Sequence, residues 1–123
     1  MKSRDSLVRL KEFQVNEKRR QLQQLQSMMS EFERMAKELV HQISLEESKS
    51  GITDPTHFAY PTFAKAARQR RDNLLASQTD LAEQRAGAEA TLAEAELELS
   101  KAEMRETRDA KARDGDGSRA MTG

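Results

Sequence analysis

The sequence predicts an all-α protein: a long two-helix antiparallel coiled-coil hairpin that is followed by a disordered C-terminal tail. Two long stretches repeat apolar residues at every seventh position, and the short segment between them contains both prolines of the chain. A seven-residue repeat keeps one stripe of a helix against a partner helix when the two helices supercoil. A short connection makes such helices antiparallel neighbours. We therefore expect one domain over residues 1–113, with helices over about 4–49 and 61–113, a connection over 50–60 and a tail over 114–123.

The composition favours a narrow seam between helices over a compact globular core. Hydrophobic residues make up 36% of the 123 residues and aromatic residues 4%, whereas 34% are charged. Basic and acidic residues number 21 each, and a general binder of nucleic acid or anionic membranes needs a basic excess. The chain has no cysteine, so it has no disulfides and no thiolate metal ligands. It also has no apolar run that could span a bilayer and no signal-peptide core, so we expect a cytoplasmic protein.

The first helix is predicted from a long stretch without helix breakers. Neither Gly nor Pro occurs from Ser3 to Ser50, and Ser3 is suited to cap the first turn. Two series of positions each recur every seven residues, and the second series lies three residues after the first. Lys11 and Lys18 occupy the second series near the N-terminus, so the apolar seam is weaker there. The expected seam residues are Val8, Val15, Leu22, Leu25, Met29, Phe32, Leu39 and Ile43.

The connection contains the residues that end and start helices. Gly51 suits the position after a helix end, where φ is positive. Asp54 and Pro55 are typical of the N-cap and first residue of a short helical turn. Pro61 ends that turn, so we expect the second long helix to begin there.

The second helix repeats the heptad pattern with smaller residues. Its two series are rich in alanine and are interrupted by Arg71, Gln78 and Arg85. Gly87 costs a helix interior about 1 kcal/mol relative to Ala, and we expect the helix to tolerate it. The leucines expected at the seam are Leu74, Leu81, Leu92 and Leu99.

The charges predict that the two helices pair with each other. Residues 1–20 carry seven basic and three acidic side chains, whereas residues 82–103 carry six acidic and two basic ones. An antiparallel hairpin places these oppositely charged segments side by side. Each exposed pair is worth less than about 1 kcal/mol, so the charges set orientation more than stability.

A register can also be predicted, in which the numbers of opposing residues add to about 110. Large side chains then face small ones, which fills the seam evenly. The rival value of 103 would leave a thin layer of Ala36 and Ala67. The layers expected in the preferred register are Leu22 with Ala88, Ala36 with Leu74, and Ile43 with Ala67.

Some side chains near the N-terminus are candidate partner contacts. On a helical wheel Leu10 and Phe13 lie opposite the seam, and Leu7 extends this apolar patch. The alternative is that they are stray surface residues or a frayed end that packs locally. A basic cluster follows at Lys18, Arg19 and Arg20, which is either a solvated helix face or a contact for an acidic protein surface.

The hairpin tip is a second candidate. Phe58, Tyr60 and Phe63 hold most of the aromatic side chains, and Arg68 and Arg70 follow them. These aromatic residues either cap the end of the seam or form a recognition tip, because loops on rigid arms commonly carry function.

Met28 and Met35 flank the seam of the first helix. Methionine at such positions usually widens the seam, and the alternative is an adaptable Met-lined binding face.

The sequence gives no indication of catalysis. His41 and His57 are the only histidines, and they lie in different predicted elements. A two-helix hairpin also has no concave interior in which to desolvate a substrate. We therefore expect no enzyme activity, no cofactor, no metal and no small-molecule substrate.

Two segments resemble a known family. The start of the chain, Met1-Lys2-Ser3-Arg4-Asp5-Ser6-Leu7-Val8-Arg9-Leu10-Lys11-Glu12-Phe13-Gln14-Val15, is similar to the alphaproteobacterial form of the flagellar export protein FliJ family. The tip, His57-Phe58-Ala59-Tyr60-Pro61-Thr62-Phe63-Ala64-Lys65-Ala66-Ala67, is similar to the same subgroup. The length and the two-helix plan also fit this family.

The resemblance implies a cytoplasmic component of the flagellar type III export apparatus, peripheral to the inner membrane. Members of the family act as a stalk in the pore of the export ATPase ring, contact the cytosolic domain of the export gate and escort export chaperones. On this basis the ATPase contact is expected at the N-terminal end of the first helix, at Leu7, Leu10, Phe13, Lys18, Arg19 and Arg20. The gate is expected to contact the tip or the middle of the rod. One alternative is a coiled-coil scaffold or adaptor without an ATPase partner. A nucleic-acid-binding arm is the other, and the zero net charge disfavours it.

Overall fold

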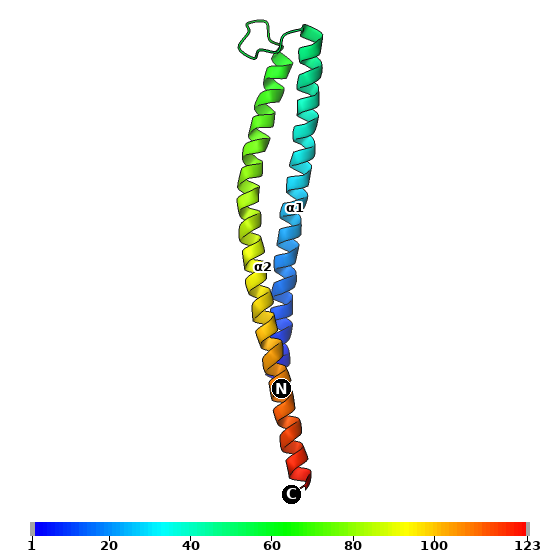
Figure 1. The fold of residues 1–123 in the computed structure, drawn as a ribbon, viewed down its shortest axis with the longest axis vertical. Coiled ribbons are helices and arrows are strands. Elements are labelled where there is room, and N and C mark those ends of the chain that lie inside the picture. Colours follow the sequence, from blue (N-terminus) through cyan, green and yellow to red (C-terminus); the bar gives the residue numbers. More distant parts are fainter. Residues whose placement is uncertain (1, 123) are drawn as a thin grey trace. The chain divides into compact units, whose positions relative to one another are not determined.

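The computed structural model describes the backbone of residues 2–122 and the side chains of residues 6–115. Over this range it consists of two α-helices, α1 (Lys2–Ser50) and α2 (Thr62–Thr122), and contains no strand. The two helices run in opposite directions and pack against each other (Figure 1), which confirms the predicted all-α hairpin. Contacts divide the chain into two units, one of residues up to Leu22 with those from Gly87 onward, and one of Gln23–Ala86. None of the described helical segments is long and apolar enough to cross a membrane.

Helix α1 ends where a glycine allows the chain to turn. Gly51 has a φ of 73°, a left-handed conformation that costs other residues energy. Its N–H donates a hydrogen bond of 2.9 Å to the carbonyl of Glu47, and the Ser50 hydroxyl donates to the same carbonyl at 3.2 Å. These bonds satisfy a carbonyl that the helix itself leaves free. The predicted helix end is thus confirmed.

The connection is built from tight turns rather than from the short helical turn predicted at Asp54. The Asp54 carboxylate accepts hydrogen bonds from the backbone N–H and the hydroxyl of Thr56, at 2.9 and 2.7 Å. These bonds, the backbone one first, lower the pKa of Asp54. The N–H of His57 donates to the Asp54 carbonyl at 3.1 Å, and that of Tyr60 to the His57 carbonyl at 3.0 Å. An aspartate in a turn bonds its own backbone two residues on, which favours this geometry over a helix.

Helix α2 begins after Pro61 and continues further than the sequence predicts. The N–H of Lys65 donates to the Pro61 carbonyl at 3.0 Å, and Gly87 lies inside the helix as expected. Residues 114–122, for which a disordered tail is expected, are helical. No proline follows Pro61 in the sequence, and glycine weakens a helix by about 1 kcal/mol without ending it.

The unit of Gln23–Ala86 packs in the predicted register. Its core joins Leu39 and Ile43 of α1 to Ala67 of α2, with Leu74 packed against them. Ile43 and Ala67 form one of the layers in which opposing numbers add to 110. The polar Gln78 lies in the seam, where its amide donates a 3.0 Å hydrogen bond to the carbonyl of Met29. Other buried residues of this unit are Ala36, Tyr60, Ala64 and Leu81.

The other unit holds the oppositely charged ends of the two helices. Val15 and Ala102 are buried in its seam. Lys11 pairs with Glu98 at 3.8 Å, and Arg19 with Glu96 at 3.9 Å, as the charge pattern predicts. The remaining predicted seam residues of the chain are half-buried: Val8, Leu22, Leu25, Met29, Phe32, Leu74, Leu92 and Leu99.

Candidate partner-binding surfaces

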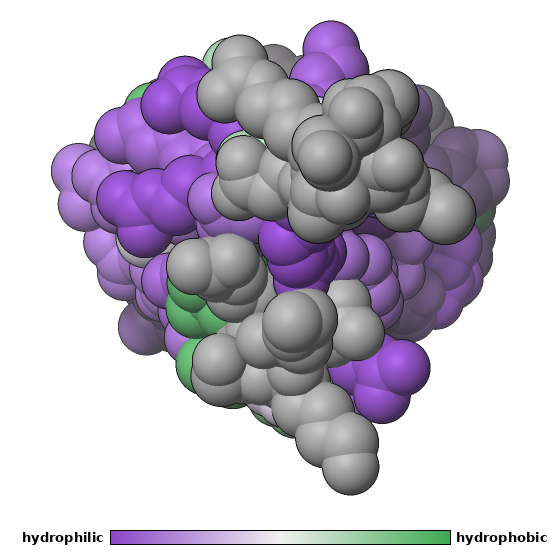
Figure 2. Space-filling view, turned by 90° about the horizontal axis from the view of Figure 1, so that it is seen from below, coloured by the Kyte–Doolittle hydropathy of each residue, from purple (hydrophilic) through white to green (hydrophobic). Residues whose placement is uncertain are grey.

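The apolar patch near the N-terminus is exposed. Leu10 is 50% and Phe13 62% accessible to solvent, whereas Val15 is buried in the seam. Leu7 is half-buried, so it lies at the edge of this patch. An exposed Leu–Phe pair on a polar helix is suited to anchor a partner, because burying it removes apolar surface from water. Figure 2 views the molecule from below and shows that the described surface on this face is mostly hydrophilic, with small hydrophobic areas.

The basic cluster is engaged within the chain. Lys18 is half-buried at a seam position. Arg19 pairs with Glu96 of α2, and Arg20 with Glu17 of its own helix at 2.9 Å. Both guanidinium groups remain more than half exposed, so these pairs are weak and open to exchange. The cluster behaves as a solvated helix face that an acidic partner could still reach.

At the tip, two of the three aromatic residues that the sequence offers as partner contacts are exposed. Phe58 is 96% exposed, and its ring stacks on that of His57 with centroids 4.8 Å apart. The N–H of Ala59 donates to Nδ1 of His57 at 3.0 Å, which ties the same loop to the imidazole. Phe63, in the first turn of α2, is also exposed. The connection therefore presents Phe58 on a loop that is held by its own hydrogen bonds.

The other two predicted tip residues hold the connection in place. Tyr60 is only 8% exposed, and its hydroxyl donates to the Glu47 carboxylate at 2.9 Å. Burial, followed by this hydrogen bond, raises the pKa of Tyr60 above its ordinary value. Arg68 pairs with the same carboxylate at 3.6 Å. Of the two readings that the sequence allows for Tyr60, the structure supports a residue that caps the end of the seam. Arg70 is exposed on α2.

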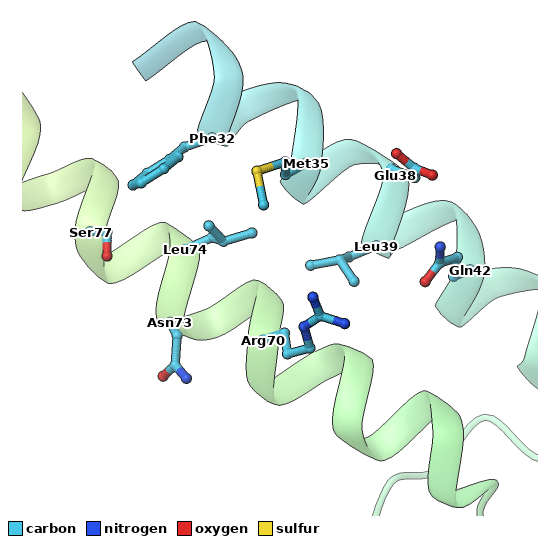
Figure 3. Close-up of a pocket in the computed structure, with 9 residues that line it drawn as sticks. All are labelled: Phe32, Met35, Glu38, Leu39, Gln42, Arg70, Asn73, Leu74 and Ser77. Atoms are coloured by element: carbon cyan, nitrogen blue, oxygen red, sulfur yellow. The ribbon is translucent and has the colours of Figure 1, made fainter. Parts of the chain in front are cut away.

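A groove lies along the seam of the unit of Gln23–Ala86. It has a volume of about 440 Å³, and Figure 3 shows Met35 and Leu74 pointing toward each other across it. A second groove of about 320 Å³ lies between the helices beside Val40 and Leu75. In the sequence, only the spacing of Met28 and Met35 indicates a binding face here. The groove itself could not be predicted, because its depth depends on the distance between the two helices. The residues that line it are Phe32, Met35, Glu38, Leu39, Gln42, Arg70, Asn73, Leu74 and Ser77.

The described residues include no group of three or more His, Asp or Glu side chains that could hold a metal ion. Comparisons of the chain with models of protein families, with curated proteins and with solved structures found no match.

Proposed function

We propose that this chain is a non-enzymatic component of the flagellar type III protein export apparatus. In this proposal it acts as a central stalk that couples or stimulates the export ATPase, contacts the cytosolic domain of the export gate and escorts export chaperones. The observation that carries the proposal is the resemblance of residues 1–15 and 57–67 to the FliJ family. The apparatus would hold the chain at the cytoplasmic face of the inner membrane.

The exposed side chains of α1 support an ATPase contact at its N-terminal end. Leu10 and Phe13 are half or more exposed, although both are large apolar residues. Arg19 and Arg20 follow within two turns and are only weakly paired. An apolar anchor with basic neighbours suits a ring whose inner surface has apolar pockets bordered by acidic residues.

The tip supports a contact with a second partner, which we propose to be the export gate. Phe58 is almost fully exposed on a loop that is fixed by hydrogen bonds, so its binding would cost little ordering entropy. Phe63 and Arg70 lie on the adjoining turns of α2 and are exposed as well. Export chaperones would bind along the remaining surface of the helices.

The experiment that tests the proposal is ATP hydrolysis by the flagellar export ATPase with and without this protein. We expect the wild type to stimulate hydrolysis and the variant Leu10→Asp/Phe13→Asp to lose the stimulation. A matched control is Leu97→Asp/Met104→Asp, which changes two equally exposed apolar residues of α2 by the same charge. The control is expected to stimulate like the wild type.

Two outcomes would count against the proposal. If the helical wild type fails to stimulate an ATPase that assembles normally, the coiled-coil scaffold or adaptor becomes the better reading. If both double variants lose stimulation equally, the effect is one of charge and not of the Leu10–Phe13 patch. Deletion of the chain from its cell should abolish motility if the stalk role is right.

A further inference from the structure

The groove beside Met35 has apolar residues at its centre, and no element of the described part of the chain covers it. Its lining includes three seam residues, of which Leu39 is buried and Phe32 and Leu74 are half-buried (Figure 3). An adjoining hollow of about 230 Å³ shares Phe32 and Ser77 with the groove and extends it to Leu81. Water in such a groove contacts apolar side chains on both walls, so covering the groove is favourable.

The same apolar face extends beyond the groove in both directions. Residues seven apart lie on the same side of a supercoiled helix. On α1, Met28 therefore lies on the same side of the helix as Met35, and Leu45 on the same side as Glu38. On α2, Phe63 lies on the same side as Arg70. All three of these large apolar side chains are about half exposed. From Met28 to Leu45 the face is about 26 Å long at 1.5 Å per residue, enough to seat a helix of several turns.

The margins of the groove carry one acid and one base. Glu38 borders it on α1 and Arg70 on α2, whereas Gln42, Asn73 and Ser77 are uncharged. In the register of this unit Glu38 and Arg70 lie at nearly the same level along the helices. Glu38 reaches Arg34 at 3.9 Å, the outer limit of an ion pair, so its carboxylate is available to another cation. Asp80 is the further charge, at the edge of the adjoining hollow.

We propose that a second copy of this chain covers the groove, in a dimer whose two-fold axis runs parallel to the helices. Helix α1 of one copy then lies beside α2 of the other. Glu38 meets Arg70 of the second copy twice, once on each side of the axis. Leu45 likewise covers Phe63 of the second copy. The interface is self-complementary, as a two-fold contact requires, and joins four helices around one seam.

Other occupants fit the groove less well. A basic helix would bring like charge to Arg70, and an acidic helix would bring like charge to Glu38. A second copy turned in the opposite sense, about an axis across the helices, would set α1 against α1 and α2 against α2, so Glu38 would not meet Arg70. Only the arrangement with the two-fold axis parallel to the helices brings Glu38 to Arg70 and Leu45 to Phe63.

The test is the oligomeric state of the full chain, measured by sedimentation equilibrium over a range of concentrations. We expect a monomer–dimer equilibrium for the wild type. Glu38→Arg and Arg70→Glu should each raise the dissociation constant about tenfold or more, because two attractive pairs become two repulsive ones. The double variant Glu38→Arg/Arg70→Glu should restore the wild-type constant. Glu33→Arg, which makes the same charge change beside the groove at Val40, is the matched control and should leave it unchanged.

A crosslinking experiment distinguishes the parallel from the inverted dimer. The chain has no cysteine, so a Leu45→Cys copy can be mixed with a tagged Phe63→Cys copy and oxidised. The mixed disulfide should dominate over either disulfide between like copies. The proposal would be overturned by a monomer at all concentrations or by a dissociation constant that neither charge reversal changes. A random distribution of disulfides would also overturn it. None of these measurements involves the ATPase, so they stand or fall separately from the proposed function.

Discussion

At the scale of single residues, the Glu47 carboxylate joins three parts of the chain. It belongs to the last turns of α1, accepts the hydroxyl of Tyr60 from the connection and pairs with Arg68 of α2. A buried tyrosine needs a hydrogen-bond partner for its hydroxyl, and Glu47 supplies one. The phenol and the guanidinium in turn compensate a carboxylate that is largely withdrawn from water. This arrangement fixes how the chain leaves α1 and enters α2.

The variant Tyr60→Phe tests the hydroxyl of this arrangement. It keeps the buried ring and removes the bond to Glu47, so we expect the free energy of unfolding to fall by about 1 kcal/mol. Phe58→Leu is the control, because Phe58 is 96% exposed and a change there should stay within about 0.5 kcal/mol. Urea unfolding followed by circular dichroism measures both. An equal loss in the two variants would mean that the hydroxyl contributes nothing.

The raised pKa of Tyr60 predicts a dependence of stability on pH. Burial is its main cause, and the bond to Glu47 adds to it. A raised pKa means that folding favours the protonated phenol, so this contribution is present below the unfolded pKa and is lost as pH rises through the folded one. Above about pH 10, the usual value for tyrosine, wild-type stability should fall more steeply than that of Tyr60→Phe.

Tyrosinate absorbance provides a direct check, because Tyr60 is the only tyrosine in the chain. The native protein should ionise at a higher pH than the urea-unfolded chain. Ionisation at the same pH in both states would show that burial does not act on this phenol.

At the scale of the helices, the seam is narrow because α2 contributes mainly alanine to it. Ala64 and Ala67 are almost fully buried near the connection, and Ala102 is buried near the other end of the seam. Small side chains let α1 come close, so larger ones at these positions should not fit. This explains how a chain with few large apolar residues can still bury part of its seam.

The variant Ala64→Leu tests this close approach. Extra methylene groups in a packed seam force strain, and we expect the free energy of unfolding to fall by about 1–3 kcal/mol. Ala66→Leu is the matched control, because Ala66 lies two residues further on and is exposed. Thermal unfolding of the two variants should separate them clearly. Equal melting temperatures would contradict the observed burial of Ala64.

The helices and their seam could be predicted from the sequence because they depend on local spacing. Heptads place Val15, Ile43 and Leu81 on one side of each helix, and the structure buries all three. Gly51 was predictable for a similar reason, since a left-handed residue ends a helix locally. The turn at Asp54 could not be predicted, because a helical cap and an aspartate turn begin with the same residue type.

At the scale of the whole chain, features that join distant residues were harder to predict. The roles of Tyr60 and Arg68 depend on where Glu47 lies, which no local pattern states. The groove beside Met35 likewise requires the spacing of two helices in addition to the sequence of each. Charge and size complementarity did predict the register, because those properties compare one helix with the other.

The register can be tested with pairs of introduced cysteines, since the chain has none of its own. Ile43→Cys/Ala67→Cys should form an intramolecular disulfide readily, because these residues meet in the core. Ala36→Cys/Ala67→Cys, which suits the rival register, should not, because Ala36 lies two turns, about 10 Å, further along α1. Oxidation under dilute conditions followed by mass spectrometry measures both pairs.

The crosslink also predicts a change in stability. A disulfide that closes a loop of this length removes entropy from the unfolded chain, which adds about 3 kcal/mol to the free energy of unfolding where geometry is unstrained. We therefore expect oxidised Ile43→Cys/Ala67→Cys to unfold at higher urea concentration than its reduced form. If the Ala36 pair crosslinks instead, α1 is shifted by one heptad against α2. That shift would also separate Tyr60 and Arg68 from Glu47, so the Tyr60→Phe variant would then cost nothing.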